Sequence, residues 1–169
     1  GYMYAHPGKK LTFMGIDIAQ FIEWDEEREL DWLLMLYPKH IFTHRYVKEL
    51  NKYYKSTPAL WENDSDWDGF RWYIVDDNNN NVFAFSRRDR SGKEVLVVSN
   101  FSNQVLKNYE IGVDTWGSYK IALNSDAKKY DGIAIANRNL KTINKEKNEF
   151  KYTLGVNIPP YATMYIEKK

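Results

Sequence analysis

The spacing of apolar residues changes at Pro58, and this change constrains the fold more than any other feature of the chain. From Ile41 to Ser56 apolar and aromatic residues recur at helical spacing, whereas after Pro58 they occur in short runs with a period of two. Proline cannot continue a helix and disfavours helical backbone at the residue before it, so the helix is predicted to end near Thr57. The chain therefore combines one amphipathic helix with a series of strands.

The predicted helix has one strongly aromatic face. That face consists of Phe42, Tyr46, Val47, Leu50, Tyr53 and Tyr54, and the opposite face is mostly charged. A single helix with such a face has to lie against another element. We expect it to pack either on a strand at Leu11–Met14 or on the strands that follow Pro58.

Seven runs after Pro58 are rich in Val, Ile, Tyr and Phe and read as short strands. They are Arg71–Val75, Val82–Arg88, Lys93–Phe101, Tyr109–Val113, Ser118–Leu123, Phe150–Val156 and Tyr161–Glu167. A marginal strand is expected at Leu140–Ile143, inside the otherwise polar loop 128–148. Turn sequences such as Asp76–Asn81 separate the runs. The pattern indicates an antiparallel sandwich or Greek-key sheet.

The segment Gly8–Trp32 has a different character. Its run Leu11–Met14 is short, apolar and flanked by Gly8 and Gly15, which predicts a strand buried on both faces of a parallel sheet. A loop dense in carboxylates and tryptophans follows. A parallel strand needs parallel neighbours, and this chain offers few of them.

Composition limits the classes of partner. The 24 Lys and Arg nearly balance the 23 Asp and Glu, so no nucleic acid or membrane partner is expected. Cysteine is absent, and neither a signal peptide nor a run approaching the ~18 apolar residues of a membrane span is visible. We expect a soluble, cytoplasmic protein. Aromatic residues make up 16% of the chain, and most of them should be core residues. Aromatic rings on the surface stack on sugars as well as on nucleic-acid bases. Because the chain has no excess of basic residues, carbohydrate is the favoured partner for such rings.

Two motifs suggest metal sites and fail on their missing ligands. Asp64–Gly69 matches the first half of a calcium loop, but Val75 stands where the pattern needs a bidentate Glu. His40 and His44 have zinc-like spacing but lack the intervening Glu and a third ligand. We interpret the first motif as a polar connection, and no metal is predicted.

The densest carboxylate cluster lies in the loop after the predicted strand. It consists of Asp17, Glu23, Asp25, Glu26, Glu27, Glu29 and Asp31. Glycoside chemistry uses two carboxylates, but sequence spacing cannot place such a pair, and a charge run is usually solvated. No nucleophile elbow, phosphate loop or dinucleotide motif is present either. The chain therefore shows no self-contained catalytic site and implies no cofactor.

Many short pieces of the chain together form a recognisable pattern. In order, they are Gly1–Leu11, Phe13–Gly15, Ala19-Gln20, Glu23-Trp24, Leu30–Trp32, Glu49–Asn51, Tyr54, Pro58–Leu60, Val98–Phe101, Leu123–Asp126 and Pro159–Thr163. In these pieces the chain resembles bacterial glycogen branching enzymes, in the α-amylase superfamily. The resemblance runs along the whole chain.

The resemblance implies a mixed, mainly β fold. Residues 1–57 would be the last strand and helix of a truncated catalytic (β/α)8 barrel, and residues 58–169 a C-terminal all-β domain of Greek-key sandwich type. Family members transfer a segment of α-1,4-glucan to a 6-hydroxyl to make an α-1,6 branch. Their catalytic carboxylates have no counterpart here, so the chain alone is expected to be inactive. Its expected partners are α-glucan and the remainder of the barrel.

By the same resemblance, Asp17, Gln20 and Trp24 would line the glucan cleft, because barrel active sites form at the C-terminal ends of strands. Two departures weaken the transfer of roles. Ile16-Asp17-Ile18 stand where family members usually show Asn-Glu-Phe, and Ile22 stands where Arg is common. An autonomous glucan-binding β module and a purely structural domain remain alternatives.

Overall fold

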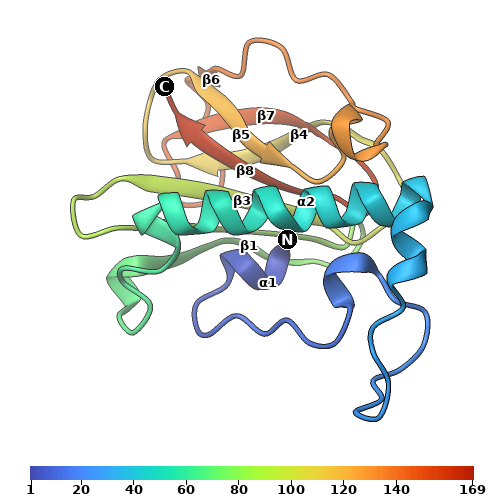
Figure 1. Ribbon diagram of the computed structural model, residues 1–169. Helices are drawn as coiled ribbons and strands as arrows, with labels where there is room; N and C mark the ends of the chain where they lie inside the picture. Colours follow the sequence, from blue (N-terminus) through green and yellow to red (C-terminus); the bar gives the residue numbers. More distant parts are fainter.

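The computed structural model describes all residues, 1–169, as two antiparallel β-sheets with one long helix across the outer face of the larger sheet (Figure 1). The helices are α1 (Tyr2–Ala5) and α2 (Pro38–Ser56), with 3-10 turns η1 (Ile16–Ile18), η2 (Trp32–Leu36), η3 (Pro58–Leu60), η4 (Trp67–Gly69) and η5 (Lys128–Tyr130). The strands are β1 (Phe70–Asp77), β2 (Val82–Arg88), β3 (Glu94–Asn100), β4 (Leu106–Val113), β5 (Tyr119–Asn124), β6 (Thr142–Ile143), β7 (Tyr152–Ile158) and β8 (Thr163–Lys168).

The larger sheet has the strand order β1-β2-β3-β8-β5, and the smaller one the order β4-β7-β6. Every neighbouring pair is antiparallel. The chain leaves the larger sheet after β3, forms β4 in the smaller sheet and returns for β5, so the two sheets are built together. The predicted antiparallel sandwich is confirmed, and all eight predicted strands are present with small shifts at their ends.

Strand β3 shows why the sequence there looks apolar without alternation. Val95 and Val97 point toward the helix side, and Leu96 and Val98 point toward the smaller sheet; all four are buried. A central strand covered on both faces buries consecutive residues, as this one does. Two hydrophobic cores therefore lie on opposite faces of one sheet.

The core between the two sheets contains residues from nearly every strand. The larger sheet contributes Leu96, Val98, Met164 and Ile166. The smaller sheet contributes Ile111, Val113, Leu154, Val156 and Ile158, which pack against them. Phe150 stacks on Tyr73 with ring centroids 4.5 Å apart. These side chains alternate along their strands, which explains the period of two in the sequence.

Helix α2 closes the second core. Leu50 is buried against the larger sheet together with Tyr4, Ala5, Leu60, Phe85 and Tyr165, and Tyr46, Tyr53 and Tyr54 pack at the margin. Pro38 occupies the first helical turn, where the missing N–H costs nothing, and the helix ends two residues before Pro58. Of the two expected packing partners for this helix, the structure shows the β-sheet.

The predicted strand at Leu11–Met14 is wrong for this chain. Residues 9–13 have no regular structure, and the Leu11 side chain is 70% exposed. A strand is stable only when a neighbour supplies hydrogen bonds, and none of the eight strands lies alongside this segment. The side chains of this run are apolar, but nothing in the chain covers them.

Neither α1 nor α2 combines the length and the apolar composition that a membrane-spanning helix requires.

Candidate functional site

Residues 8–37 form an irregular segment, called here the arm, that projects beside one end of α2 (Figure 1, lower right). Two contacts fix it to the helix. The buried His40 ring donates from Nδ1 to the carbonyl oxygen of Ile18 at 2.7 Å, and the Phe21 ring meets the His40 ring edge-on at 5.0 Å. His40 is thus a structural residue that anchors the arm.

Gln20, one of the three predicted cleft residues, is engaged inside the arm. Its side-chain oxygen accepts a hydrogen bond from Asp31 N at 3.0 Å. This bond holds together the two ends of the loop that runs from Gln20 to Asp31. Gly15 has a φ of +79°, and a Cβ at that position would meet the Gln20 side chain at 2.8 Å. Glycine is therefore required at position 15 for both backbone conformation and space. Gln20 holds the shape of the arm.

Asp17 lies on the rim of a hollow between the arm and α2. The hollow has a volume of about 510 Å³, and its walls include Phe13, Ile16, His44 and Val47. His44 Nδ1 lies 3.4 Å from Asp17 Oδ2, without hydrogen-bond geometry. Both side chains remain partly exposed, so the hollow offers one carboxylate and one imidazole to a polar ligand.

Trp24 lies elsewhere on the arm and does not line this hollow. Its ring packs edge-on against Phe13 at 6.1 Å, and both rings are more than half exposed. An exposed aromatic pair is a suitable surface for the apolar face of a sugar ring. The structure thus brings Asp17 near the helix and Trp24 near Phe13, and it does not join the three predicted residues into one site. Their role as glucan contacts stays a prediction.

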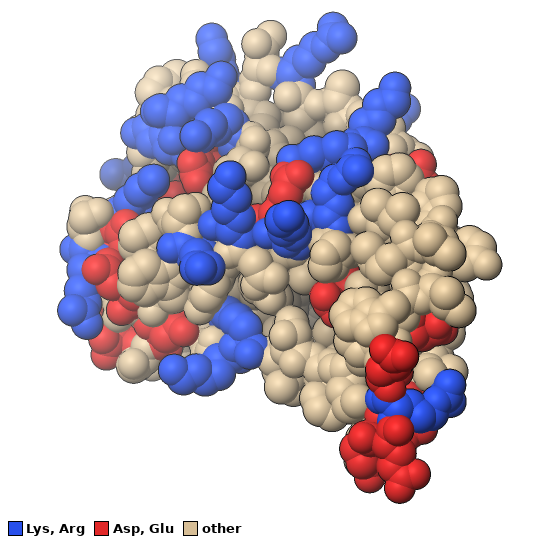
Figure 2. Space-filling view, viewed as in Figure 1, with Lys and Arg blue, Asp and Glu red and all other residues tan.

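The acidic residues of the arm are spread through its tip rather than gathered around a centre. Figure 2 shows the tip as a mostly red projection at the lower right, while Lys and Arg side chains are spread over the upper and left parts of that face, with further Asp and Glu among them at the left. The one hydrogen bond formed by a carboxylate within the tip joins Glu27 N to Asp25 Oδ1 at 3.0 Å. This arrangement fits the interpretation of a solvated charge run. The near-zero net charge of the chain therefore conceals a local concentration of acidic groups at the tip.

The two metal-like motifs have structural partners instead. Asp64 forms an ion pair with the fully buried Arg87 and accepts a hydrogen bond from Gly8 N at 3.3 Å. His40 binds the carbonyl of Ile18, as described, and His44 faces Asp17. No three side chains of His, Asp or Glu come together in a group that could hold a metal ion.

The feature that sequence analysis missed is the unburied apolar surface of the arm. Half of the exposed large hydrophobic side chains of the molecule lie between positions 11 and 37; they are Leu11, Phe13, Ile16, Phe21, Ile22, Trp24, Trp32, Leu33, Leu36 and Tyr37. Phe21 is 83% exposed and Leu33 70%. So large a concentration marks an interaction surface. The signal was present in the sequence, as an apolar run with no neighbouring strand.

Comparison with known proteins places this geometry in a family. Residues 72–169 match the model of the alpha amylase, C-terminal all-beta domain. The matched region spans all of the strands except the first two residues of β1. This chain belongs to that family. The expected mainly β, α-amylase-type fold is therefore confirmed for the part after α2.

The relatives of this alpha-amylase C-terminal domain include branching enzymes. The chain is 42% identical over 169 residues to the 1,4-alpha-glucan branching enzyme GlgB of Aquifex aeolicus (strain VF5), with 99% of the chain and 27% of that enzyme covered. It is 38% identical over 169 residues to the enzyme of the same name from Halothermothrix orenii, with the same coverage. The resemblance to glycogen branching enzymes is confirmed, and the chain spans about a quarter of the length of these relatives.

Two solved structures share the fold. One is the catalytic module of the glycogen-degrading pneumococcal virulence factor SpuA, with a TM-score of 0.54, 16% identity, and 83% of this chain and 20% of that chain covered. The other is the Group B Streptococcus pullulanase SAP, with a TM-score of 0.53, 16% identity, and coverage of 83% and 18%. At this identity the likeness concerns the fold alone.

Proposed function

We propose that this chain is the C-terminal part of a 1,4-alpha-glucan branching enzyme and contributes structure and glucan contacts rather than bond-making groups. The observation that carries the proposal is 42% identity over 169 residues to an enzyme of that name, of which the match covers 27%. The remaining three-quarters would hold the catalytic carboxylates. Branching keeps a glucan segment covalently bound between cleavage and transfer, which requires a nucleophile and an acid/base.

The apolar surface of the arm supports the proposal physically. Side chains such as Phe21, Leu33 and Leu36 lie in water here, and each would gain about 1.5–3 kcal/mol on full burial. The remainder of a (β/α)8 barrel is the partner we propose for them. Residues 9–14, irregular in the isolated chain, would then gain strand neighbours and pair as the last strand of the barrel.

In this arrangement α2 joins the two parts of the enzyme. Leu50 is already buried on the larger sheet with Tyr46, Tyr53 and Tyr54 packed around it, and His40 anchors the arm to the first turn of the helix. Asp17 and Trp24 would face the glucan at the edge of the cleft, and Gln20 would hold the loop that carries Trp24. The β domain would keep α2, and through it the arm, at a fixed position.

The isolated chain tests this proposal. Incubated with amylose, it should leave the iodine colour unchanged and produce no new α-1,6 linkages after debranching analysis. New branches made by the purified chain would contradict the proposal, because no carboxylate pair here is built for the chemistry.

An autonomous glucan-binding module is the second candidate, and exposed tryptophans favour it. Trp67 is 85% exposed, and Trp116 packs edge-on against Tyr152 at 5.4 Å with more than half of its surface free. Maltooligosaccharide titration monitored by tryptophan fluorescence separates the candidates. Saturable quenching that is lost in Trp116→Ala but retained in Trp24→Ala would favour the module; no response would favour a structural domain.

A further inference from the structure

The outer face of the smaller sheet carries a hollow of about 250 Å³, called here the outer-face hollow. Its lining residues on β7 alternate with Leu154, Val156 and Ile158, which point into the core between the sheets. Neither α2 nor the arm contributes a residue to it. Small-molecule sites typically measure about 300–1,000 Å³, so a hollow of this size suits one small unit of a larger ligand.

The floor of the outer-face hollow is a glycine that lies opposite a β-bulge. The pairing of β4 with β7 shifts its register between Leu106 and Tyr109, and Asn108 within this bulge has a φ of +48°. The Asn108 carboxamide lies over Gly155, since a Cβ on Gly155 would collide with Asn108 Oδ1. Bulges re-aim side chains, and a glycine inside a strand often marks a point where another group approaches closely. The bulge thus directs Asn108 across the neighbouring strand.

Asn157 holds both walls of the outer-face hollow in place. Its Oδ1 accepts a hydrogen bond from Asn108 N at 2.8 Å, and its Nδ2 donates to the carbonyl oxygen of Ala136 at 2.8 Å. Asn137 adds two bonds to the Asn157 backbone: Asn137 Nδ2 donates to the carbonyl oxygen at 2.8 Å, and Asn137 Oδ1 accepts from the amide nitrogen at 2.7 Å. The bulge and the loop before β6 are therefore fixed on β7, which reduces the entropy that binding costs.

Four polar side chains at the outer-face hollow have no hydrogen-bond or ion-pair partner in the protein. They are the exposed residues Asn108, Arg138, Asn139 and Lys141. The one carboxylate of the hollow is balanced by contrast, because Glu110 accepts hydrogen bonds from the Lys145 ammonium group at 2.7 and 2.8 Å. The unpartnered groups are therefore two amides and two cations.

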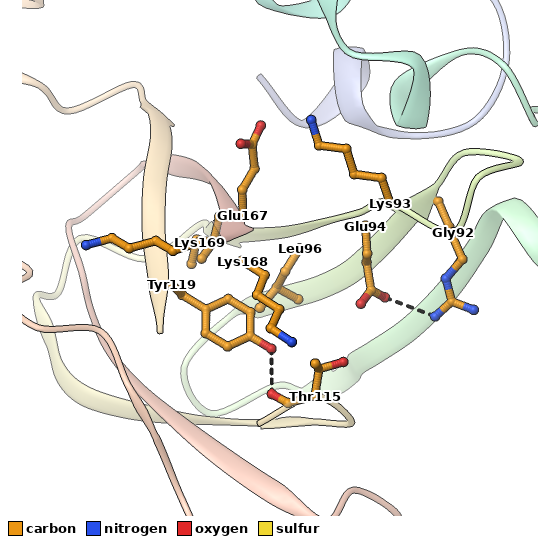
Figure 3. A pocket seen from close by; sticks show the side chains of 11 residues that line it. Gly92, Lys93, Glu94, Leu96, Thr115, Tyr119, Glu167, Lys168 and Lys169 are labelled. Carbon is orange, nitrogen blue, oxygen red and sulfur yellow. Dashed lines mark hydrogen bonds and ion pairs between the residues drawn. The ribbon is translucent and has the colours of Figure 1, made fainter. Parts of the chain in front are cut away.

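The hollow of about 450 Å³ at one end of the larger sheet differs in this respect (Figure 3). Leu96 and Tyr119 in its wall are buried, and the Tyr119 hydroxyl donates to the carbonyl oxygen of Thr115 at 2.8 Å. Glu94 accepts a hydrogen bond from Arg88 at 3.4 Å. No side-chain amide lines that hollow. The outer-face hollow is therefore the better candidate for an uncharged polar ligand.

We propose that the outer-face hollow binds one glucosyl unit of an α-glucan through hydrogen bonds to its hydroxyl groups. A hydroxyl both donates and accepts, and a carboxamide does the same, so Asn108 and Asn139 can each pair with a hydroxyl in either sense. Arg138 and Lys141 supply further donors to hydroxyl oxygens. No aromatic residue lines the hollow, so ring stacking has no part in this contact. The choice of glucose rests on the proposed function, whereas the hydroxyl chemistry rests on the amides.

Titration of maltotriose into the isotopically labelled chain, followed by NMR, tests the proposal. The side-chain amide signals of Asn108 and Asn139 and the backbone signal of Gly155 should shift and saturate at millimolar concentration. Shifts centred on the tryptophan indole signals would contradict the proposal, and so would the absence of any shift at Asn108. Inorganic phosphate is the second probe. An affinity for phosphate equal to that for maltotriose would show an anion site and overturn the proposal.

Two asparagine variants locate the contact. Asn108→Gly removes the carboxamide and suits the positive φ of this position, and it should weaken maltotriose binding at least fivefold. Asn79→Gly, at an exposed asparagine in the turn between β1 and β2, is the matched control and should leave the affinity unchanged. Equal losses in the two variants would contradict the assigned site.

Gly155→Ala tests the same contact without removing a polar group. The added Cβ would displace the Asn108 side chain from the floor, so binding should weaken at least fivefold while the NMR spectrum stays that of a folded chain. Full affinity in this variant would show that the sugar does not enter the hollow. Branch formation by an enzyme that contains this chain is measured separately, so a failed titration leaves the branching assignment standing, and a failed branching assay leaves the binding result standing.

Discussion

The Tyr53 hydroxyl donates a hydrogen bond to Glu167 Oε1 at 2.7 Å and thereby joins α2 to β8 across 114 positions of sequence. The same carboxylate binds Lys120 of β5 at 3.1 Å. Three elements thus meet at one largely buried acid. The contact holds the helix, which carries the arm, to the sheet.

Replacing Tyr53 with Phe should test this contact without disturbing packing. The ring remains against Tyr165, while Glu167 loses one of its two donors. We expect a loss of about 1–2 kcal/mol in the free energy of unfolding, measured by urea denaturation. Tyr161→Phe is the matched control, because its exposed side chain forms no hydrogen bond, and it should change stability by less than about 0.5 kcal/mol.

The same contact predicts a dependence on pH. Burial raises the pKa of Glu167, but hydrogen bonds from Tyr53 and Lys120 outweigh it and hold the pKa below its ordinary value of 4.5. An acid with a lowered folded-state pKa stabilises the fold fully above its unfolded-state value, and this contribution disappears as pH falls through the folded-state value. The stability difference between the native chain and Tyr53→Phe should therefore be constant above about pH 5 and shrink below pH 4.5. A difference that grows on acidification would contradict this.

Leu50→Asp should detach α2 from the sheet. Leu50 is buried among the residues of the second core, and the substitution places an unpaired charge there. The expected loss is about 2–5 kcal/mol or more, seen as a large drop in melting temperature. Lys52→Asp, on the exposed side of the same helix, should have a small effect. An unchanged melting temperature for Leu50→Asp would show that the helix is not packed as described.

Arg87→Met should be among the most damaging substitutions in the sheet. The fully buried guanidinium group donates to the carbonyl oxygens of Ala5 at 2.8 Å and Leu60 at 3.1 Å and also pairs with Asp64. Removal of one partner leaves buried acceptors and a carboxylate without donors, which costs about 3–5 kcal/mol. Arg138→Met, at an exposed arginine without an ion pair, provides the comparison. Similar unfolding midpoints for both variants would show that the buried network contributes nothing.

Local patterns predicted the β-sandwich well, because its strands find their partners within the chain. Buried residues such as Val82 and Val97 follow each other along a strand or alternate with exposed ones, depending on whether both faces of the sheet are covered or only one. The end of α2 was predictable because Pro58 cannot continue a helix. The run Leu11–Met14 failed for the opposite reason. It has the composition of a buried strand, but a strand depends on neighbours that this chain does not contain.

The candidate site was predictable only in part. The resemblance to branching enzymes was the basis for predicting Asp17, Gln20 and Trp24 as cleft residues. In the structure, contacts between residues about eleven positions apart in the sequence fix two of them: Gln20 binds Asp31 N, and Trp24 packs on Phe13. A hollow of about 450 Å³ at one end of the larger sheet also had no sequence signal, because lining residues such as Arg88, Tyr119 and Lys168 come from β2, β5 and β8 and are brought together by the strand register. Spacing along the chain carries no information on such a group.

A chimeric enzyme tests the central claim most directly. The region that this chain matches in the Aquifex aeolicus 1,4-alpha-glucan branching enzyme would be replaced by residues 1–169, and α-1,6 linkages formed on amylose would be counted after debranching. We predict that the chimera makes branches, and that Leu33→Ser with Leu36→Ser, two exposed residues of the arm, lowers its activity at least tenfold by weakening the contact of the arm with the rest of the enzyme. A soluble, folded chimera that makes no branches would contradict the assignment of this chain to a branching enzyme.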